Sequence, residues 1–290
     1  MFNPYFSRLA GRFATLSPAG RARARNAAQF DDDHLLSRFS LLDHLFIIRA
    51  LMLRNLRTKH SESRFGFLVE FIQPVFIIGI HYYGFTIMNR YMPARIPVEL
   101  FVMGGFTTWF ALSHTVRGKH GRPGRIPMLN TRITPMHSML SGALWECISN
   151  IWIYFAALIV FMILGFHDPL PNIPLSITVY FVASAVGFGL RLIFDAIGEV
   201  FSMMHTLKVS LMWMVFFTGG IYFSAYRLNN PLGELALYNP ALHLLEYQRH
   251  ALFAGYPVAT VSMIYPTFCA MGLILTGLIL KRWIELWHHD

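Results

Sequence analysis

Charged side chains are scarce in this sequence of 290 residues, of which Asp, Glu, Lys and Arg make up 13%. Acids are the scarcer sign, with 15 against 24 Lys and Arg. Hydrophobic residues make up 55%, and the mean hydropathy of +0.46 lies far above that of an ordinary soluble domain. This composition predicts an integral membrane protein. The basic residues stand at the ends of apolar runs, where they orient a membrane protein, so we expect no nucleic acid as a partner.

The sequence also lacks the common motifs of nucleotide, metal and hydrolase sites. It contains no GxxxxGK[ST], no HExxH and no GxSxG. Cys147 and Cys269 both fall inside apolar runs, which favours small packing residues over a disulfide or a metal pair. His288 and His289 supply too few ligands for a metal site on their own. We therefore expect no catalytic residue, metal or cofactor in this chain.

No apolar signal segment opens the sequence. Residues 1–30 hold five arginines and no acid, and three aspartates follow directly. The absence of an apolar h-region excludes a secretory signal. We expect residues 1–40 to form a disordered cytoplasmic tail near anionic headgroups, with a mitochondrial presequence as the alternative.

Six apolar runs are long enough to cross a bilayer. The predicted spans are 67–87, 98–116, 142–166, 175–197, 207–225 and 258–280. Residues 41–57 precede the first span and are typical of an interfacial helix. Its apolar face consists of Leu45, Ile48, Leu51, Met52 and Leu56. At the end of the fourth span Arg191, Asp195 and Glu199 recur every four residues, which favours a local ion-pair ladder over a proton relay.

Residues 226–257 are too polar and too rich in proline for a simple span. We interpret them as two short helices, 231–237 and 240–254, that lie at the outer surface or dip into it. The predicted fold class is therefore an all-α integral membrane protein. It has six transmembrane helices, an N-terminal cytoplasmic interfacial helix and an outer re-entrant helical hairpin between spans five and six. The membrane domain covers residues 41–282, and 283–290 form a C-terminal tail.

The distribution of basic residues predicts the orientation. With both termini in the cytoplasm, the inner segments hold 20 Lys and Arg and the outer segments hold 4. The most basic break between apolar runs, 117–146, lies between spans two and three and stays inside; its five basic residues fall in 117–132. Its second half resembles a short amphipathic helix, which Asn130 or Thr131 can cap and in which Pro135 fits the first turn. Such a helix is a suitable point of contact for a protein outside the membrane.

Three stretches resemble a known family. They are RALMLRNLRTKHSESRFGFLVEFIQPVF (49–76), RITPMHSMLSGALWE (132–146) and FFTGGIYFSAYRLNNPLGELALYNPALHLLEYQRHALFAGY (216–256). The last contains the spacing YNPxxHxxExxR, formed by Tyr238, Asn239, Pro240, His243, Glu246 and Arg249. These stretches are similar to the membrane subunits of type-2 ABC exporters, and within them to the capsular and lipopolysaccharide exporters of Gram-negative bacteria. The long N-terminal tail and HGRPGR (120–125) depart from the pattern of the family.

The resemblance implies a permease subunit without ATPase activity in the bacterial inner membrane. Two copies would form a pore, and two separate ATP-binding subunits would bind ATP and Mg. The substrate would be a lipid-linked or otherwise anchored anionic polysaccharide, capsular in kind, and further partners would be periplasmic and outer-membrane polysaccharide export proteins. Export of a drug or a lipid is the alternative within the superfamily, and a membrane-embedded transferase is the alternative outside it.

The resemblance and the residue types together give three sets of candidate site residues. The ATPase-coupling set is Arg132, Ile133, Thr134, Pro135, Met136 and Met139. The substrate-path set is Tyr82, Tyr83, Trp109, Phe110, Tyr222, Tyr226 and Arg249. The lipid-phosphate gate is Arg54, Arg57, Lys59 and Arg64. Interfacial aromatic residues and simple anchoring in anionic headgroups are the alternatives for the path and gate sets. For Arg249 the sequence favours a pair with Glu246 over a contact with the glycan.

Overall fold

The structure is a computed structural model that describes residues 41–62, 66–88, 92, 95–118, 134–165, 171–201, 203–228 and 231–287. All regular structure in these ranges is helical, which confirms the all-α class. The helices are α3 (Leu41–Glu62), α4 (Gly66–Ile87), α5 (Val98–Arg117), α6 (Pro135–Ile163), α7 (Ile173–Val200), α8 (Met204–Thr218), η3 (Ala225–Arg227), α9 (Pro231–Ala236), α10 (Pro240–Leu252) and α11 (Ile264–Trp287). The predicted tail 1–40 lies outside the described residues.

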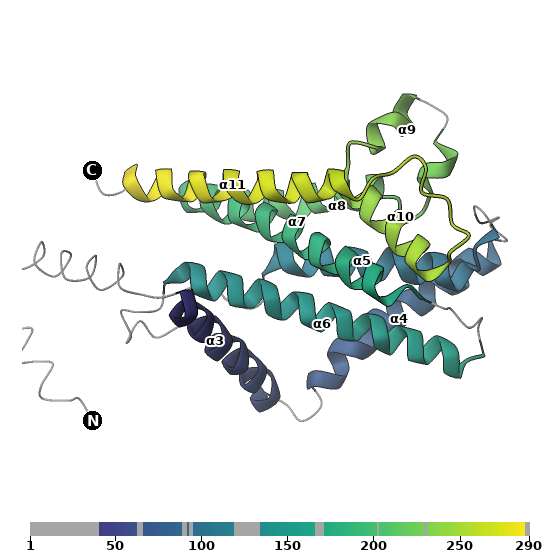
Figure 1. Cartoon of the computed structure of the whole chain (residues 1–290), viewed down its shortest axis with the longest axis horizontal. Coiled ribbons are helices and arrows are strands. Elements are labelled where there is room, and N and C mark those ends of the chain that lie inside the picture. The colour runs from purple at the N-terminus through teal and green to yellow at the C-terminus, as the bar shows by residue number, and fades with distance from the viewer. Residues whose placement is uncertain are drawn as a thin grey trace, which may run out of the picture.

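The long helices form a bundle along the longest axis of the molecule (Figure 1). The C-terminal end of α11 and the N-terminal end of α6 lie at one end of this bundle, and α9 and α10 lie at the other (Figure 1). Helix α3 runs obliquely below the start of α6 and packs against it.

Three helices, α6, α7 and α11, are long and apolar enough to cross a membrane. Helices α4 and α8 contain shorter apolar stretches, Ile72–Ile87 and Thr206–Thr218. Helix α5 has 20 residues and covers the second predicted span. The described residues therefore form a helical protein with several apolar helices suited to a bilayer.

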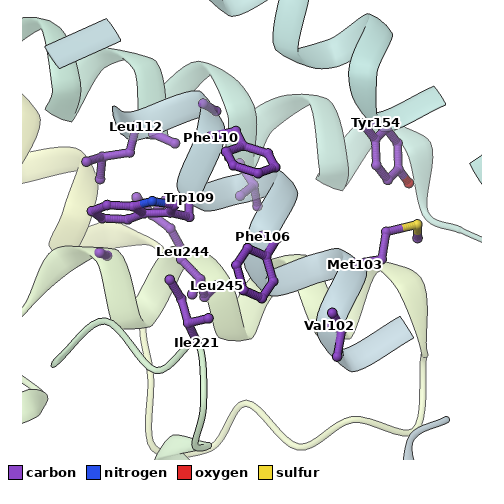
Figure 2. Close-up of a cluster of buried hydrophobic side chains, with 14 of the residues drawn as sticks. Val102, Met103, Phe106, Trp109, Phe110, Leu112, Tyr154, Ile221, Leu244 and Leu245 are labelled. Carbon is purple, nitrogen blue, oxygen red and sulfur yellow. The ribbon is translucent and has the colours of Figure 1, made fainter. Parts of the chain in front are cut away.

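Helix α5 is the centre of the bundle. Every residue from Glu99 to Ser113 is buried, and α4, α6, α7 and α10 pack around it. Figure 2 shows the side chains of Phe106, Trp109 and Phe110 from α5 among Leu244 and Leu245 from α10. A helix that is buried on all sides has no polar face, and its hydrophobic residues show no amphipathic stripe.

Two helix ends differ from the sequence prediction. Span five was predicted to run to residue 225, but α8 ends at Thr218 because Gly219 and Gly220 follow. Gly220 has a φ of +80°, a left-handed conformation that does not continue a helix. The cap predicted at Asn130 or Thr131 is also wrong, since Thr134 caps α6 and Pro135 directly follows it.

The ends of span six differ as well. Helix α11 begins at Ile264, six residues after the predicted start, and continues to Trp287, past the predicted end of the membrane domain. It packs closely on α7 at two glycines. A Cβ atom added to Gly189 would lie 2.6 Å from Leu273 Cβ, and one added to Gly277 would lie 2.5 Å from Leu192 Cβ. Side chains at these two positions would force the helices apart.

Candidate functional site

The YNPxxHxxExxR segment forms the start and the first three turns of α10. Asn239 caps the helix, since its Oδ1 accepts the Ala241 N–H at 2.9 Å, and Pro240 occupies the first turn. The Asn239 amide also donates to the Val215 carbonyl at 3.1 Å and to Thr218 Oγ1 at 2.8 Å. The Asn239 side chain therefore caps α10 and also links it by hydrogen bonds to the end of α8.

Arg249 lies inside the protein with no exposed surface. Its guanidinium lies 3.5 Å from the centre of the Phe101 ring of α5. Its nitrogens donate to four backbone carbonyls, at distances between 2.8 and 3.3 Å. The acceptors are Phe101, Gly220, Ile221 and Phe223. One arginine thus joins α5, α10 and the irregular segment after α8.

Glu246 neutralises this buried arginine. Its Oε1 accepts from Arg249 Nη1 at 2.7 Å, and its Oε2 accepts from Ser224 Oγ at 2.9 Å. The Tyr256 hydroxyl, in the loop between α10 and α11, lies 3.0 Å from the same Oε2 and 2.6 Å from Ser224 Oγ. Burial raises the pKa of Tyr256 to about 12, so this hydroxyl keeps its hydrogen and remains a donor. The pairing of Glu246 with Arg249 that the sequence favoured is confirmed.

This network explains how an irregular backbone can lie within an apolar region. After α8 the chain turns at 219–224, and its carbonyls lack helical partners. Non-helical backbone that is buried among apolar side chains is tolerated only where protein satisfies its polar groups. Arg249 supplies the donors, Glu246 supplies the counter-charge, and a buried pair of this kind is costly to break. The guanidinium is enclosed by protein, so the structure does not place Arg249 on a surface that a glycan could contact.

His243 connects the outer segments. Its Nε2 donates to the Leu237 carbonyl at 2.7 Å, and its Nδ1 accepts the Ser262 N–H at 3.0 Å. Its ring lies 4.9 Å from the ring of Tyr265 in α11. The Tyr265 hydroxyl donates to the Tyr238 carbonyl at 2.7 Å, so the motif also fixes α9 and α11.

The predicted path aromatics separate into three environments. Trp109 and Phe110 are buried, Tyr83 and Tyr226 are exposed, and Tyr82 and Tyr222 lie between. Tyr82 points toward α6, where its ring lies 6.5 Å from that of Phe161. The exposed rings make no contact with the buried ones among the described contacts. The structure therefore brings together only part of this set.

Trp109 and Tyr222 both contact Phe216 of α8, at ring distances of 5.1 and 5.6 Å. Phe106 lies beside them, 6.3 Å from Phe216. His81 of α4 completes the cluster: its Nδ1 donates to the Ile77 carbonyl at 2.8 Å, and its Nε2 lies 3.2 Å from the Tyr222 hydroxyl. We call Phe106, Trp109, Phe216, Tyr222 and His81 the aromatic cluster.

Sequence reasoning missed three members of the aromatic cluster, His81, Phe106 and Phe216. His81 carried a usable signal, because a polar ring inside an apolar run usually faces protein or water. Phe106 and Phe216 carried none, since phenylalanine is common throughout these spans. The cluster joins α4, α5, α8 and the turn after α8, so relative movement of these helices would disturb it.

The predicted coupling region is the first turn of α6. Thr134 Oγ1 accepts the His137 N–H at 3.4 Å, and His137 Nδ1 accepts the Thr134 N–H at 3.1 Å, which makes a capping box with histidine in the third position. The other ring nitrogen of His137 then carries a hydrogen and donates to His44 Nδ1 of α3 at 2.8 Å. The two rings also stack. This contact joins the interfacial helix to the start of α6.

The coupling candidates differ in accessibility. Pro135 is exposed, while Thr134 and Met136 are half-buried. Met139 is buried against Ala143 and against Phe188 and Leu192 of α7, so it belongs to the packing of the bundle. Arg132 and Ile133 lie outside the described residues. Met136 packs partly against the same cluster as Met139, so Pro135 is the exposed residue among the described candidates.

Most of the lipid-phosphate candidates lie outside the residues that the structure describes. Arg54 is half-buried on α3. The side chains of Arg57 and Lys59 and the whole of Arg64 lie outside the part of the chain that the structure describes.

The ladder at the end of α7 is confirmed in part: Arg191 Nε lies 3.3 Å from Asp195 Oδ2, and Lys208 Nζ of α8 lies 3.5 Å from Oδ1.

The described residues contain no group of three or more His, Cys, Asp or Glu that could hold a metal ion. Cys147 and Cys269 are both free thiols. In the described part of the chain, α4, α5 and α8 meet in a largely buried aromatic cluster, and Pro135 at the start of α6 is exposed.

No family model matches the chain. Three curated relatives align with most of its length. Polysialic acid transport protein KpsM of Escherichia coli is 25% identical, over 81% of this chain and 92% of its own. Capsule polysaccharide export inner-membrane protein BexB of Haemophilus influenzae is 22% identical, over 81% and 90%. The inner-membrane protein CtrC of Neisseria meningitidis serogroup A, named likewise for capsule polysaccharide export, is 20% identical, over 82% and 91%. Over most of its length, the chain is therefore related to the inner-membrane proteins of capsule polysaccharide export.

Proposed function

We propose that this chain is the permease subunit of an ATP-driven ABC exporter that moves a polysaccharide across the inner membrane. The observation that carries the proposal is the relationship to capsule export proteins over most of both chains. The glycan is capsular in kind, anionic, and linked to a lipid or another anchor. The chain itself lies in the inner membrane with both termini in the cytoplasm.

ATP and Mg bind in a separate partner chain, two copies of which contact the permease dimer. The absence of a nucleotide loop from the sequence supports this division. The start of α6 supports it as well, since Pro135 is exposed and Met136 half-buried beside the contact with α3. Closure of the ATPase would push on this helix start, and the His44–His137 contact would pass the displacement to α3.

The finer architecture belongs to the same proposal. We interpret α4, α5, α6, α7, α8 and α11 as six spans, and α9 with α10 as a re-entrant hairpin at the outer face. Exposed apolar side chains on α8, such as Trp213 and Phe217, support contact with a second copy of the chain. The aromatic cluster lies directly behind them, so a path between two copies would pass beside it. Periplasmic and outer-membrane export proteins would continue that path.

The test begins with a strain that lacks this chain, in which surface polysaccharide should be lost and wild-type protein should restore it. Tagged wild-type protein should retain the ATPase encoded beside it. The variant Arg132→Ala/Pro135→Ala/Met136→Ala should retain a folded membrane protein and fail to restore export, because the helix start would lose its contact with the ATPase. ATP hydrolysis by the reconstituted complex should lose its response to the permease.

The control is Pro174→Ala, which changes an exposed first-turn proline of α7 and should restore export fully. Full export by the triple variant together with no retained ATPase would refute the coupling assignment. If the deletion strain keeps its surface polysaccharide while the tagged protein still retains the ATPase, the chain would instead export a drug or a lipid.

A further inference from the structure

A cavity of about 980 Å³ opens between α5, α7 and α8 near the end of the bundle that holds the α11 C-terminus. It is separate from the irregular segment around Arg249, and its lining comes from one copy of the chain. Lys281 of α11 and Met139 of α6 border it, and Lys281 Nζ lies 3.6 Å from Met139 Sδ. The residues that line it differ sharply between its two ends.

One end of the cavity is positively charged. Four basic residues line it against two acids. They are Arg117, Arg191, Lys208 and Lys281, with Asp195 and Glu199. Asp195 is shared, since Arg191 and Lys208 both lie within 3.5 Å of its carboxylate. The cavity therefore keeps an excess of positive charge, which would attract an anion.

The position of Arg191 is fixed by the end of α5. Gly118 has a left-handed φ of +57°, and a Cβ atom there would lie 2.4 Å from both Nε and Cζ of Arg191. The guanidinium consequently packs directly against Gly118, while Asp195 Oδ2 lies 3.3 Å from its Nε. Arg191 is almost completely buried, so this end of the cavity has a rigid cation.

The other end of the cavity is apolar and aromatic. On two helices the lining changes from a cation to an aromatic residue over eight residues, about 12 Å of helix. On α5 the change runs from Arg117 to Trp109, and on α8 it runs from Lys208 to Phe216. The two aromatic residues meet edge to face at 5.1 Å. Met212 and Trp213 line the wall between the charged and the aromatic residues. The cavity is thus charged at one end and apolar at the other.

We propose that this cavity binds an anionic phospholipid, with the phosphate among Arg117, Lys208 and Lys281 and an acyl chain along α8 toward Trp109. The charged end lies toward the α11 C-terminus, at the predicted membrane edge, and the apolar end extends along α5 and α8 toward the predicted membrane interior. An anionic headgroup with a hydrocarbon chain matches both ends, whereas a free phosphate would match only one. The proposal stands whether or not the chain exports a polysaccharide.

The test uses the full chain in a non-ionic detergent, with brominated acyl chains as quenchers of tryptophan fluorescence. Dibrominated phosphatidylglycerol should quench saturably and bind about tenfold or more tightly than dibrominated phosphatidylcholine, since each cation near a headgroup strengthens anionic lipid binding several-fold. In Arg117→Gln/Lys208→Gln the two lipids should bind alike. In Trp109→Phe part of the saturable quenching should disappear.

The matched control is Arg49→Gln/Arg282→Gln, which removes two exposed cations at the same end of the bundle but outside the cavity. This variant should keep the preference for phosphatidylglycerol. If the double cavity variant does not fold, Arg117→Gln alone, at an exposed residue, gives the same comparison with a smaller effect. Equal binding of both lipids, equal loss in cavity and control variants, or full displacement by inorganic phosphate would overturn the proposal.

Discussion

At Arg249 the sequence predicted the correct neighbour and missed the environment. A glutamate three residues before an arginine on a helix predicts their pairing wherever the helix lies. This spacing contains no information on the burial of Arg249, which follows here from the turn at 219–224 and its carbonyls. The sequence does not indicate which carbonyls need a donor, because every residue has one. Gly219 and Gly220 end α8 before this turn.

Arg249→Lys should destabilise the protein strongly. A lysine ammonium is a compact point charge and cannot reproduce three nitrogens that reach four separate carbonyls. We expect a loss of about 3–5 kcal/mol, typical of a disrupted buried pair, seen as a lower melting temperature in detergent and less protein in the membrane. Glu234→Gln, at an exposed residue of α9, is the control. Wild-type melting of Arg249→Lys would show that the network contributes little.

At the scale of helices, the sequence predicted which segments are helical better than it predicted the residues at which each helix begins and ends. Apolar runs predicted α4, α5, α6 and α7 to within a few residues in most cases, and Pro231 and Pro240 indicated the starts of α9 and α10. The N-cap of α6 was placed wrongly because several Asn and Thr residues compete in NTRIT (130–134). The close approach of α7 and α11 was not predicted, since glycines are found throughout the apolar runs of this sequence.

Gly189→Ala and Gly277→Ala should each weaken the packing of α7 on α11. Each added methyl would overlap backbone or Cβ atoms of the neighbouring helix, which cannot move independently. We expect losses of about 1–3 kcal/mol per site, measured by denaturation in detergent. Gly272→Ala lies on α11 with open space around its Cβ position and should cost nothing. Equal stability of all three variants would contradict close helix packing in the membrane.

At the scale of the whole molecule, composition predicted a helical membrane protein, and the apolar helices α6, α7 and α11 agree with it. The orientation that the charge distribution predicts stays a prediction. The candidate site was predicted only in part. Trp109 and Tyr222 lie in the aromatic cluster, whereas Tyr83 and Tyr226 lie on the surface. The same aromatic residue types occur at membrane edges and along a substrate path, so the sequence does not distinguish the two roles. The packing of the helices does.

A second copy of the chain should lie on α8. In a background with Cys147→Ala and Cys269→Ala, Phe217→Cys should form a disulfide-linked dimer in membranes, because this exposed position lies beside the aromatic cluster. Phe268→Cys, similarly exposed on α11, should remain monomeric. Dimers at both positions, or at α11 alone, would place the interface elsewhere.

The burial of α5 on all sides also determines how motion in this protein can be observed. A spectroscopic label tolerates an exposed site, and α11 offers one at nearly every turn, for example Phe268, Met271 and Leu275. Between Glu99 and Ser113 there is none, because any attached probe would displace the core. The central helix must therefore be followed through its neighbours, with distances recorded between labels on α4, α8 and α11.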